Sequence, residues 1–443
     1  MNETRSYDIA NLIVGLGATG LSCARFLSSR NESCVVIDRG QPNAERMAQC
    51  QALGVEVHVN TWSEAWFDRA AKIWLSPGTP LDDPAVSPHR ARVTSDIEAF
   101  LANVRVPVIG VTGSNGKSTV TAWLAHVLTG LGCKAQMAGN IGIPALDALA
   151  LPAKVYVLEL SSFQLERLER PALDVAIMLN VSEDHLDRYS DIEAYAAAKH
   201  VIFEGAGQVI FNADDSRTRP SRGAAISVGT SANAEWQIVA DTSGGCVRFE
   251  GETVLQGRTI RLAGTHNLFN AGVVMAAAHA MGFTPAQIAA EMATFGGLPH
   301  RCRHVADIRG VQWYNDSKAT NVGATLAAVE GLSARHEQIV LLAGGQGKGQ
   351  DFAPLKTLQG KVRALIVFGE DAGRIRESVA DSLAVESAAD LEQAMLRARQ
   401  VAEAGDAVLL SPACASFDQF SGYAERGKVF EARVLEWARE VCA

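Results

Sequence analysis

The chain has 443 residues, of which 48% are hydrophobic and 20% charged, and this composition is typical of a globular protein with about three domains. Its formal net charge of −9 disfavours a nucleic-acid partner, and no apolar run is long enough to insert into a membrane. The eight cysteines form no C-x-x-C pair and the N-terminus has no signal-peptide pattern, so we expect a cytoplasmic protein with reduced thiols.

Strand-like runs and helical patterns alternate along the chain, which predicts α/β units with parallel sheets. The first unit opens with a strand at Ile9–Val14, a glycine loop at Gly15–Gly20 and a helix that runs to Leu27. A second strand at Cys34–Ile37 ends at Asp38. This G-x-G-x-x-G pattern with a later acidic residue favours a nicotinamide site, although the motif alone requires only a phosphate or a close backbone contact at a helix start.

Two more strands of the first unit are expected at Val55–Val59 and Lys72–Leu75. The second of these leads into the turn Ser76-Pro77-Gly78. Ligands of open α/β sheets bind at the carboxyl ends of strands, so this turn is a candidate ligand contact.

The most informative stretch is Gly110–Thr119, which reads GVTGSNGKST and lies between an apolar run and the helical stretch Thr119–Leu131. In a strand–turn–helix of this kind, backbone amides and the helix N-terminus face a phosphate. Lys117 adds a positive charge, and Ser118 can reach Mg²⁺. Val111 replaces the first glycine of the strict phosphate-loop pattern, which leaves the tighter form T-G-x-N-G-K-[ST].

Three polar positions of this second unit are candidate metal ligands or proton carriers. Glu159 ends an apolar strand beside the phosphate loop, where Mg²⁺ is usually held, and a capping or ion-paired glutamate is an equal alternative. His185, in the polar block Asn180–Arg188, could ligate a metal or transfer a proton. Lys199 is either an exposed helix lysine or one with a lowered pKa that adds CO₂ to form a carbamate. The other expected elements are strands at Val106–Val111, Val155–Leu160 and Val175–Leu179, a loop near Ala263–His266 and a helix at Asn267–Ala280.

The third unit, after the linker-like segment Gly296–His300, again has polar or glycine-rich loops after its strands. Asn315–Asn321 offers side chains suited to ribose hydroxyls and phosphates, Gly344–Gly349 carries Lys348, which suits a carboxylate or phosphate, and Ser411–Phe420 follows the last strand. Three such loops at corresponding strand ends indicate a ligand site. Strands are expected at Val311–Tyr314, Gln338–Ala343, Ala364–Phe368 and Ala407–Leu410.

Together these blocks resemble the Mur ligase family, and the resemblance covers nearly the whole chain. The motifs LELSSFQ, NDSKATN and SPACAS-x-DQF resemble the glutamate-adding branch rather than those that add alanine, a diamino acid or a dipeptide. The blocks that carry the resemblance are Thr112–Thr119, Leu158–Gln164, Asn180–Arg188, His266–Asn270, Leu298–Arg301 with Asn315–Asn321, and Ser411–Phe420.

The resemblance implies an α/β fold of three domains. These would be an N-terminal Rossmann-like unit at 1–95 for the UDP-substrate, a central P-loop ATPase-type parallel sheet at 96–299, and a C-terminal Rossmann-like unit at 300–443 for the incoming amino acid. It implies an ATP-dependent ligase that adds glutamate to UDP-N-acetylmuramoyl-L-alanine through an acyl phosphate, in the cytoplasmic part of peptidoglycan synthesis. ATP, two Mg²⁺ ions and a carbamylated Lys199 would take part, and we expect a monomer.

The resemblance also assigns roles to single residues. Lys117, Glu159, His185 and Lys199 would be catalytic, with Ser118, Glu159, His185 and Lys199 as Mg²⁺ ligands. ATP would be bound by Gly113, Asn115, Gly116, Lys117, Ser118, Thr119, Asn270, Arg301, Asp316 and Lys318. The UDP-substrate would be bound by Gly15, Gly17, Thr19, Gly20, Asp38, Arg39, Ser76, Pro77, Gly78, Asn140 and Gln164, and glutamate by Thr320, Lys348, Ser416 and Tyr423.

The chain departs from the family pattern beside the expected amino-acid pocket. Gln346 and Gln350 stand where the family has an acidic and a small residue around Lys348, and Tyr423 replaces a phenylalanine. These changes bear on how glutamate is recognised, including its D or L form, and leave the ATP chemistry untouched.

Three other functions compete with this interpretation. An NAD-dependent oxidoreductase would explain residues 15–38 but neither the phosphate loop nor Lys199. A non-catalytic nucleotide-binding regulator would not need Lys117, Glu159, His185 and Lys199 together. Another amide ligase of the same fold, such as folylpolyglutamate synthase, would begin directly with its ATPase domain.

Overall fold

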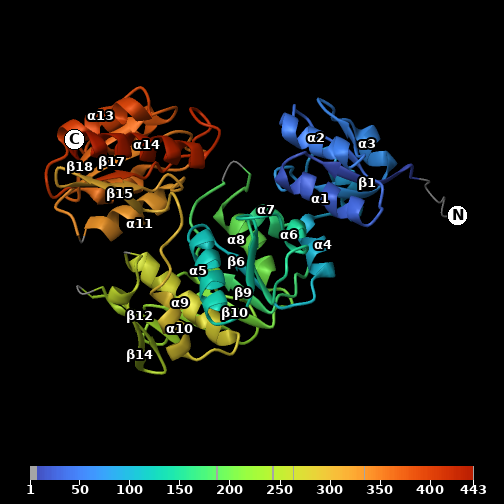
Figure 1. Cartoon of the computed structure of the whole chain (residues 1–443), viewed down its shortest axis with the longest axis horizontal. Coiled ribbons are helices and arrows are strands. Elements are labelled where there is room, and N and C mark those ends of the chain that lie inside the picture. The colour runs from blue at the N-terminus through green and yellow to red at the C-terminus, as the bar shows by residue number, and fades with distance from the viewer. Residues whose placement is uncertain (1–6, 186–187, 242–243, 263, 334, 443) are drawn as a thin grey trace.

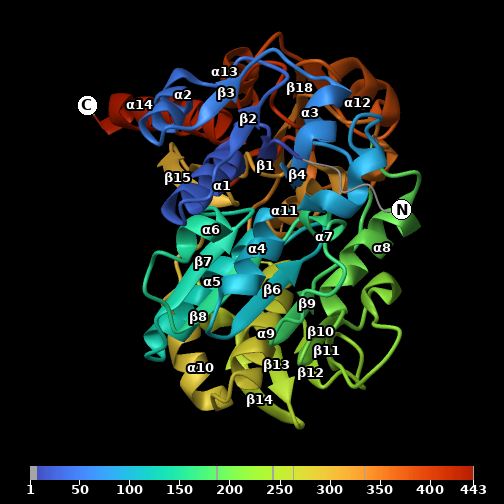
Figure 2. The ribbon, with the colours of Figure 1, turned by 90° about the vertical axis from the view of Figure 1, so that its right-hand side faces the viewer.

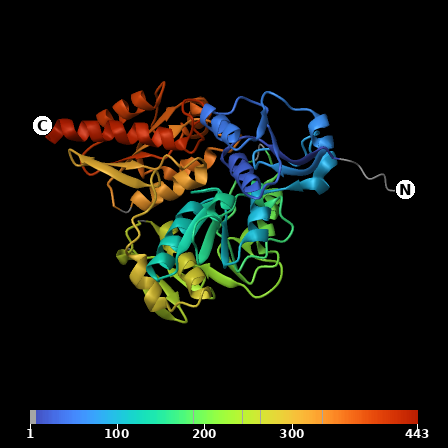
Figure 3. The same cartoon turned by 45° about the vertical axis from the view of Figure 1, so that its right-hand side comes forward.

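The computed structural model describes residues 7–185, 188–241, 244–262, 264–333 and 335–442, and it contains three α/β units, each built around its own sheet (Figure 1). The blue N-terminal unit and the red C-terminal unit both lie on the same side of the central one, as Figures 1 and 3 show. Residues 186–187 of the predicted polar block and residue 263 of the predicted loop fall outside the described residues. No helix in the described part of the chain is long and apolar enough to cross a membrane.

The N-terminal unit is a five-stranded parallel sheet with helices packed against it. Its elements are β1 (Ile9–Val14), α1 (Ala18–Ser29), β2 (Val35–Ile37), α2 (Ala44–Ala52), β3 (Glu56–His58), α3 (Glu64–Arg69), β4 (Ala70–Leu75) and β5 (Val93–Thr94). The strand order is β3-β2-β1-β4-β5. Leu12, Ile13 and Val14 are buried on both faces of β1, as expected for a parallel strand covered by helices.

The central unit is a nine-stranded sheet in the order β14-β13-β12-β11-β10-β9-β6-β8-β7, which Figure 2 shows across its width. Its elements are α4 (Asp96–Asn103), β6 (Val108–Thr112), α5 (Lys117–Gly130), β7 (Ala135–Gly139), α6 (Ala145–Ala148), β8 (Val155–Glu159), α7 (Ser162–Leu165), β9 (Val175–Met178), α8 (Ile192–His200), β10 (Gln208–Asn212), β11 (Ile226–Gly229), β12 (Trp236–Val239), β13 (Cys246–Phe249), β14 (Glu252–Gln256), α9 (Thr265–Ala280) and α10 (Pro285–Met292). Trp123 of α5 and Val274 of α9 share one buried cluster, so these two helices form the main apolar layer against this sheet.

The C-terminal unit is a six-stranded sheet in the order β15-β16-β20-β17-β18-β19. Its elements are β15 (Arg303–Ile308), β16 (Val311–Asn315), α11 (Val322–Ser333), β17 (Ile339–Gly344), β18 (Val362–Phe368), α12 (Ala372–Val379), β19 (Val385–Ser387), α13 (Leu391–Val401), β20 (Ala407–Leu410) and α14 (Tyr423–Cys442). The strands β16, β20 and β17 are parallel neighbours. The three predicted ligand loops follow these strands, so they lie beside one another at one edge of the sheet.

Antiparallel pairs extend two of the sheets beyond the parallel pattern that the sequence suggested. β13 pairs antiparallel with β12 and β14, and β15 pairs antiparallel with β16. In the turn Glu250-Gly251 the φ values are 52° and 81°, and in the turn Arg309-Gly310 they are 54° and 80°. Two successive residues with positive φ make the tight turn whose twist suits an antiparallel hairpin. A residue followed by glycine between two short strands was therefore the signal for both hairpins.

The two outer units contact the central unit in different ways. Leu21 and Ala24 of α1 share one buried apolar cluster with Phe100 of α4 and Leu146 of α6, so apolar packing continues from the N-terminal unit into the central one. The buried clusters of the C-terminal unit contain only residues of that unit. Side chains of Asn321 and Lys348 make polar contacts with the central unit.

Candidate active site

The phosphate loop between β6 and α5 depends on two glycines. Gly113 and Gly116 have φ values of 146° and 85°, in the region that favours glycine. A Cβ at Gly113 would lie 3.0 Å from Leu179 Cβ, and one at Gly116 would lie 3.0 Å from Asn270 Oδ1. Gly116 directly precedes α5, so the free amides of the first helical turn are available to an anion at this loop.

Two lysines from different helices converge on this loop. Lys117 Nζ donates to Gly113 O at 2.6 Å and to Ser114 O at 2.9 Å, and Lys199 Nζ donates to the same Gly113 oxygen at 3.0 Å. Lys199 is 1% exposed, which excludes an ordinary exposed helix lysine. Burial, and then the charge of Lys117, lower the pKa of Lys199 well below its usual value, and desolvation also lowers the pKa of Lys117.

Glu159, at the carboxyl end of β8, holds a charged carboxylate beside these lysines. Its Oε1 accepts a hydrogen bond from Asn140 Nδ2 at 2.8 Å. Burial raises the pKa of Glu159, but the charge of Lys117 and the nearby Ser118 hydroxyl outweigh it, and the pKa lies below its usual value. Glu159 Oε2 and Ser118 Oγ are buried, and neither has a hydrogen-bond partner of good geometry. Two such oxygens beside a phosphate loop are suited to a divalent cation.

Aromatic rings fix the wall that carries His185 and Lys199. His185 has a φ of 56°, and its ring lies 4.8 Å from the Phe163 ring and 6.3 Å from the Tyr195 ring, measured between centroids. Lys199 Nζ lies 4.2 Å from the centroid of the same Tyr195 ring. His185 Nε2 is 3.8 Å from Asp184 Oδ2. The imidazole and the buried amine therefore share one wall.

A cavity of about 410 Å³ lies between the central and C-terminal units. The central unit lines it with Asn115, Gly116, Lys117, Ser118, Asn140, Glu159, His185 and Lys199, among others, and the C-terminal unit with Thr320, Lys348, Ser416 and Tyr423. The structure thus brings into one cavity all the residues that the sequence assigned to catalysis, to Mg²⁺ and to glutamate.

A second cavity of about 150 Å³ shares some of its lining with the first. Its lining includes Asn115, Gly116, Thr119, Asn270, Arg301, Asp316 and Lys318. Asp316 accepts hydrogen bonds from Ser411 Oγ at 2.9 Å and from Cys302 N at 3.0 Å, and burial raises the pKa of Asp316 to about 7. The residues predicted to bind ATP, apart from Gly113, therefore line two neighbouring cavities. Gly113 lines neither cavity, and its carbonyl oxygen accepts hydrogen bonds from both lysines.

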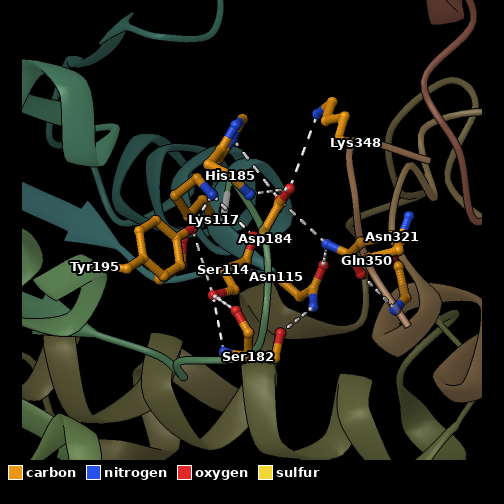
Figure 4. Close-up of polar contacts among 12 residues, drawn as sticks. Ser114, Asn115, Lys117, Ser182, Asp184, His185, Tyr195, Asn321, Lys348 and Gln350 are labelled. Carbon is orange, nitrogen blue, oxygen red and sulfur yellow. Dashed lines mark hydrogen bonds and ion pairs between the residues drawn. The ribbon is translucent and has the colours of Figure 1, made fainter. Parts of the chain in front are cut away.

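Polar contacts join the phosphate loop to the C-terminal unit (Figure 4). Asn321 Nδ2 donates to Asn115 Oδ1 at 3.1 Å and to Asp184 Oδ2 at 3.4 Å. Lys348 Nζ lies 3.8 Å from Asp184 Oδ1. Asp184 therefore stands between the phosphate-loop side of the cavity and the lysine expected to meet the amino acid.

The glycine loop of the N-terminal unit lies outside these cavities. A Cβ at Gly20 would lie 1.9 Å from Gly15 O, whereas Gly17 faces open space. The third glycine is therefore needed for close helix–strand packing, and the second leaves room for a ligand. Asp38 Oδ2 accepts a hydrogen bond from Leu16 N at 2.7 Å, so this carboxylate holds the loop itself.

The other residues assigned to the UDP-substrate are more dispersed. Ser76 Oγ donates to Gly15 O at 3.2 Å, which places the Ser76–Gly78 turn against the start of the glycine loop. Arg39 pairs with Asp83 and lies 3.6 Å from a Trp62 ring centroid. Asn140 belongs to the large cavity, as described above. Gln164 closes a capping box with Ser161 at the start of α7 and is not among the residues that line either cavity.

Comparisons with known proteins agree with this geometry. Residues 10–97 match the family model "Mur ligase MurD-like, N-terminal domain", residues 111–278 match "Mur ligase middle domain", and residues 300–414 match "Mur ligase, glutamate ligase domain". A UDP-N-acetylmuramoylalanine–D-glutamate ligase of Pseudomonas fluorescens is 41% identical, over 97% of this chain and 98% of that protein. The protein of the same name from Teredinibacter turnerae is 44% identical, over 98% and 99%. The chain belongs to the Mur ligase family.

Solved Mur ligase structures share the fold at low sequence identity. The UDP-N-acetylmuramate–alanine ligase of Thermotoga maritima has a TM-score of 0.62 at 18% identity, over 97% of this chain and 99% of that one. A pseudomurein peptide ligase of Methanothermus fervidus has the same TM-score at 17% identity, over 96% and 100%. These structures confirm the α/β fold class. The family models and the two relatives at 41% and 44% identity confirm the family and the prediction of a ligase enzyme of peptidoglycan synthesis.

Several residues of this Mur ligase cavity received no role from the sequence. Asp184, Asn321, Phe163 and Phe417 all lie inside motifs that were recognised, but nothing in a motif shows which side chains face the cavity. Arg167 lies outside every recognised motif. Its guanidinium donates to Leu75 O at 2.9 Å and to Pro77 O at 3.2 Å, and also to Thr79 O, so it holds the turn of the N-terminal unit from the central unit.

Proposed function

We propose that this Mur ligase joins glutamate to UDP-N-acetylmuramoyl-L-alanine with ATP, through an acyl phosphate, in a cytoplasmic step of peptidoglycan synthesis. The observation that carries the proposal is the 410 Å³ cavity, where the phosphate-loop residue Lys117 and the buried Glu159 face Lys348 and Ser416 of the C-terminal unit. The names of the relatives and the glutamate ligase family model at residues 300–414 support the choice of substrates. The chain would act as a monomer.

Each unit would contribute one substrate. We assign residues 1–95 to the UDP-substrate, 96–299 to ATP and 300–443 to the amino acid. ATP would place its phosphates at Gly113–Thr119 and extend into the 150 Å³ cavity, where Asn270 would meet the base and Asp316 the ribose. Arg301 and Lys318 line both cavities, so either can reach a phosphate.

The residues present fit magnesium at this site. Ser118 Oγ and Glu159 Oε2 are the buried oxygens without a partner of good geometry, and they suit an ion that also takes phosphate oxygens as ligands. In the described part of the chain, no three His, Cys, Asp or Glu side chains gather as a metal site of their own. A second ion would therefore need His185 together with the carbamate form of Lys199. Bound Mg²⁺ would supply charge neutralisation among the reacting anions.

The chain's own residues account for the remaining requirements of the reaction. Lys117 would offset negative charge as the carboxylate of the UDP-substrate attacks the γ-phosphate and ADP leaves. The glutamate amine, positioned by Thr320, Lys348, Ser416 and Tyr423, would then attack the acyl phosphate and release phosphate. An acyl phosphate hydrolyses in water, so the polar contacts that Asn321 and Lys348 make between the two units would help to protect it.

The nicotinamide alternative has no support from the comparisons, because residues 10–97 match a Mur ligase model. Asp38 accepts hydrogen bonds from Leu16 N and from Gly40 N, at 2.7 and 2.9 Å, so it would hold the glycine loop whichever ligand binds there. Calorimetric titration separates the two ligands. We expect the UDP-substrate to bind and NAD not to bind, and micromolar NAD binding without UDP-substrate binding would restore the oxidoreductase.

Phosphate release tests the proposed reaction. The enzyme is given ATP, Mg²⁺ and UDP-N-acetylmuramoyl-L-alanine, with D-glutamate, L-glutamate or no amino acid in separate reactions. We expect release that depends on D-glutamate, and Lys117→Ala to lose more than nine-tenths of it, about 1.4 kcal/mol or more of transition-state stabilisation, while remaining folded. Release that ignores the amino acid, or that survives Lys117→Ala, would contradict the proposal.

A further inference from the structure

The two glutamines that depart from the family pattern have different surroundings. Gln346 Nε2 donates to Glu370 Oε2 at 2.9 Å in an exposed position. Gln350 is 7% exposed and does not line the cavity that contains Lys348. An effect of Gln350 on the amino-acid pocket must therefore pass through the residues that it contacts.

The side-chain amide of Gln350 forms hydrogen bonds with buried backbone groups through both its oxygen and its nitrogen. Val322 N donates to Gln350 Oε1 at 2.9 Å, and Gln350 Nε2 donates to Ala413 O at 2.7 Å. The orientation of the amide is fixed, because an N–H needs an acceptor and a carbonyl needs a donor. Val322 is 7% exposed and Ala413 is fully buried, so losing the amide leaves two buried polar groups without this partner.

These bonds join the three loops that carry the residues assigned to glutamate. Val322 is two residues after Thr320, Gln350 is two residues after Lys348, and Ala413 is three residues before Ser416. Figure 4 shows Gln350 beside Asn321 on the C-terminal side of the cavity, with Lys348 above it. One side chain thus connects the segments that follow the neighbouring strands β16, β17 and β20.

The backbone of two of these loops needs support from its surroundings. Lys348 and Ala413 have φ values of 51° and 59°, which are unfavourable for residues other than glycine. Each stands on a loop that Gln350 holds. A small residue at position 350 could not make either side-chain bond.

We propose that Gln350 is a positioning residue for the incoming amino acid. Its two hydrogen bonds fix the relative positions of the loops that carry Thr320, Lys348 and Ser416. This inference rests on the proposed function, because it takes glutamate as the ligand of these three residues. Gln350 touches no substrate, so its removal affects glutamate binding and leaves the sites for ATP and the UDP-substrate as they are.

Steady-state kinetics with each substrate varied in turn tests this role. Gln350→Met keeps most of the side-chain volume and removes both hydrogen bonds, and Gln350→Glu keeps the acceptor for Val322 N but loses the donor to Ala413 O. We expect both variants to raise the KM for glutamate by about tenfold or more, with the KM values for ATP and the UDP-substrate within about twofold of wild type. Gln359→Met, at an exposed glutamine of the same unit, is the matched control and should leave all three KM values unchanged.

The outcomes separate the inference from the proposed function. If the wild-type enzyme shows no glutamate-dependent phosphate release, the proposed function is wrong. If the wild type is active and both Gln350 variants keep its KM for glutamate, the positioning role is wrong. A uniform rise in all three KM values with a lower melting temperature, or an equal effect of Gln359→Met, would also overturn it.

Discussion

Single residues of the cavity concentrate positive charge where the reaction would bring anions together. Lys117 and Lys199 donate to one carbonyl oxygen, that of Gly113, and Arg301 also lines the cavity. The charges of Lys117 and Arg301 stabilise the carboxylate of Glu159. Burial makes the charged form of Lys199 unfavourable, so a larger fraction of this residue is the neutral amine than in a surface lysine, whose pKa is near 10.4.

The lowered pKa of Lys199 predicts that this residue works as a carbamate. Only a neutral amine adds CO₂, and the anionic product would sit among Lys117 and the proposed magnesium ion. We expect Lys199→Ala to lose nearly all phosphate release and formate or acetate to restore part of it. A carbamate signal in ¹³C NMR with labelled bicarbonate should be present in the wild type and absent from the alanine variant.

Lys199→Arg is the control for this prediction, because its side chain fills the space and stays cationic. Carboxylates should not rescue it. Full activity of Lys199→Arg, or no rescue of Lys199→Ala, would mean that no carbamate is needed.

Asp316 predicts a pH dependence of stability. Burial raises its pKa to about 7, against the hydrogen bonds from Ser411 and Cys302 and the charge of Arg301. Between about pH 4 and 7 the folded protein holds a proton that the unfolded chain releases, so this group makes stability fall as the pH rises through that range. Asp316→Asn removes the proton uptake. The urea-unfolding midpoint of the variant, relative to that of the wild type, should therefore be higher at pH 8 than at pH 5. Parallel profiles of the two proteins would contradict the shifted pKa.

At the scale of elements, the site depends on which strand ends lie beside one another. The sheet order puts β16, β20 and β17 together, although β20 follows them by more than sixty residues. The turns of the edge hairpins, Glu250-Gly251 and Arg309-Gly310, have a different role, because none of these residues lines either cavity. Changes there should alter stability without changing substrate binding.

Gly251 tests that separation. Its φ of 81° suits glycine, and a Cβ there would meet no atom within 4 Å, so only the backbone conformation opposes a side chain. Gly251→Ala should destabilise the protein by about 1 kcal/mol and leave all KM values unchanged, as thermal unfolding and kinetics can check. Gly373, in α12, also faces open space but has no positive φ, so Gly373→Ala should be neutral or stabilising. Equal effects of the two changes would contradict the assignment of strain to the hairpin turn.

At the scale of the whole molecule, the two joints of the central unit differ in kind. The N-terminal unit shares a buried apolar cluster with the central one, whereas the described buried clusters of the C-terminal unit contain only its own residues, and polar contacts join it to the central unit at the cavity. Polar contacts exchange readily with water, and apolar burial does not. The C-terminal unit is therefore the one expected to open, about the segment Gly296–Pro299.

Arg167 tests the N-terminal joint. Its guanidinium donates hydrogen bonds to three carbonyl oxygens of the segment Leu75–Thr79. The compact ammonium group of a lysine cannot reach all three at once. Arg167→Lys should raise the KM for the UDP-substrate about tenfold and leave those for ATP and glutamate nearly unchanged. Arg170→Lys, nearby and exposed, is the control. An equal rise in all three KM values for Arg167→Lys would contradict a specific role at this joint.

Local patterns were sufficient to predict most of the strands and the phosphate loop. β20 has the bounds predicted from its apolar run. β8 and β9 each end one residue before the predicted end, and β6 begins two residues later and ends one residue later than predicted. An apolar run and a glycine turn depend on neighbours in the chain, so the sequence shows them directly. The hairpins at Glu250-Gly251 and Arg309-Gly310 were missed, because alternating runs alone do not reveal strand direction.

The sequence by itself determined the family, the α/β class and the residue types available for chemistry. Only the tertiary structure decided that Lys199 is buried against Gly113 and Tyr195, and that Gln350 faces backbone rather than the cavity. Burial and hydrogen-bond partners depend on segments that are far apart in the chain and meet only when the sheets assemble. A lowered lysine pKa and a buried amide that holds three loops arise from that assembly, which no local pattern contains.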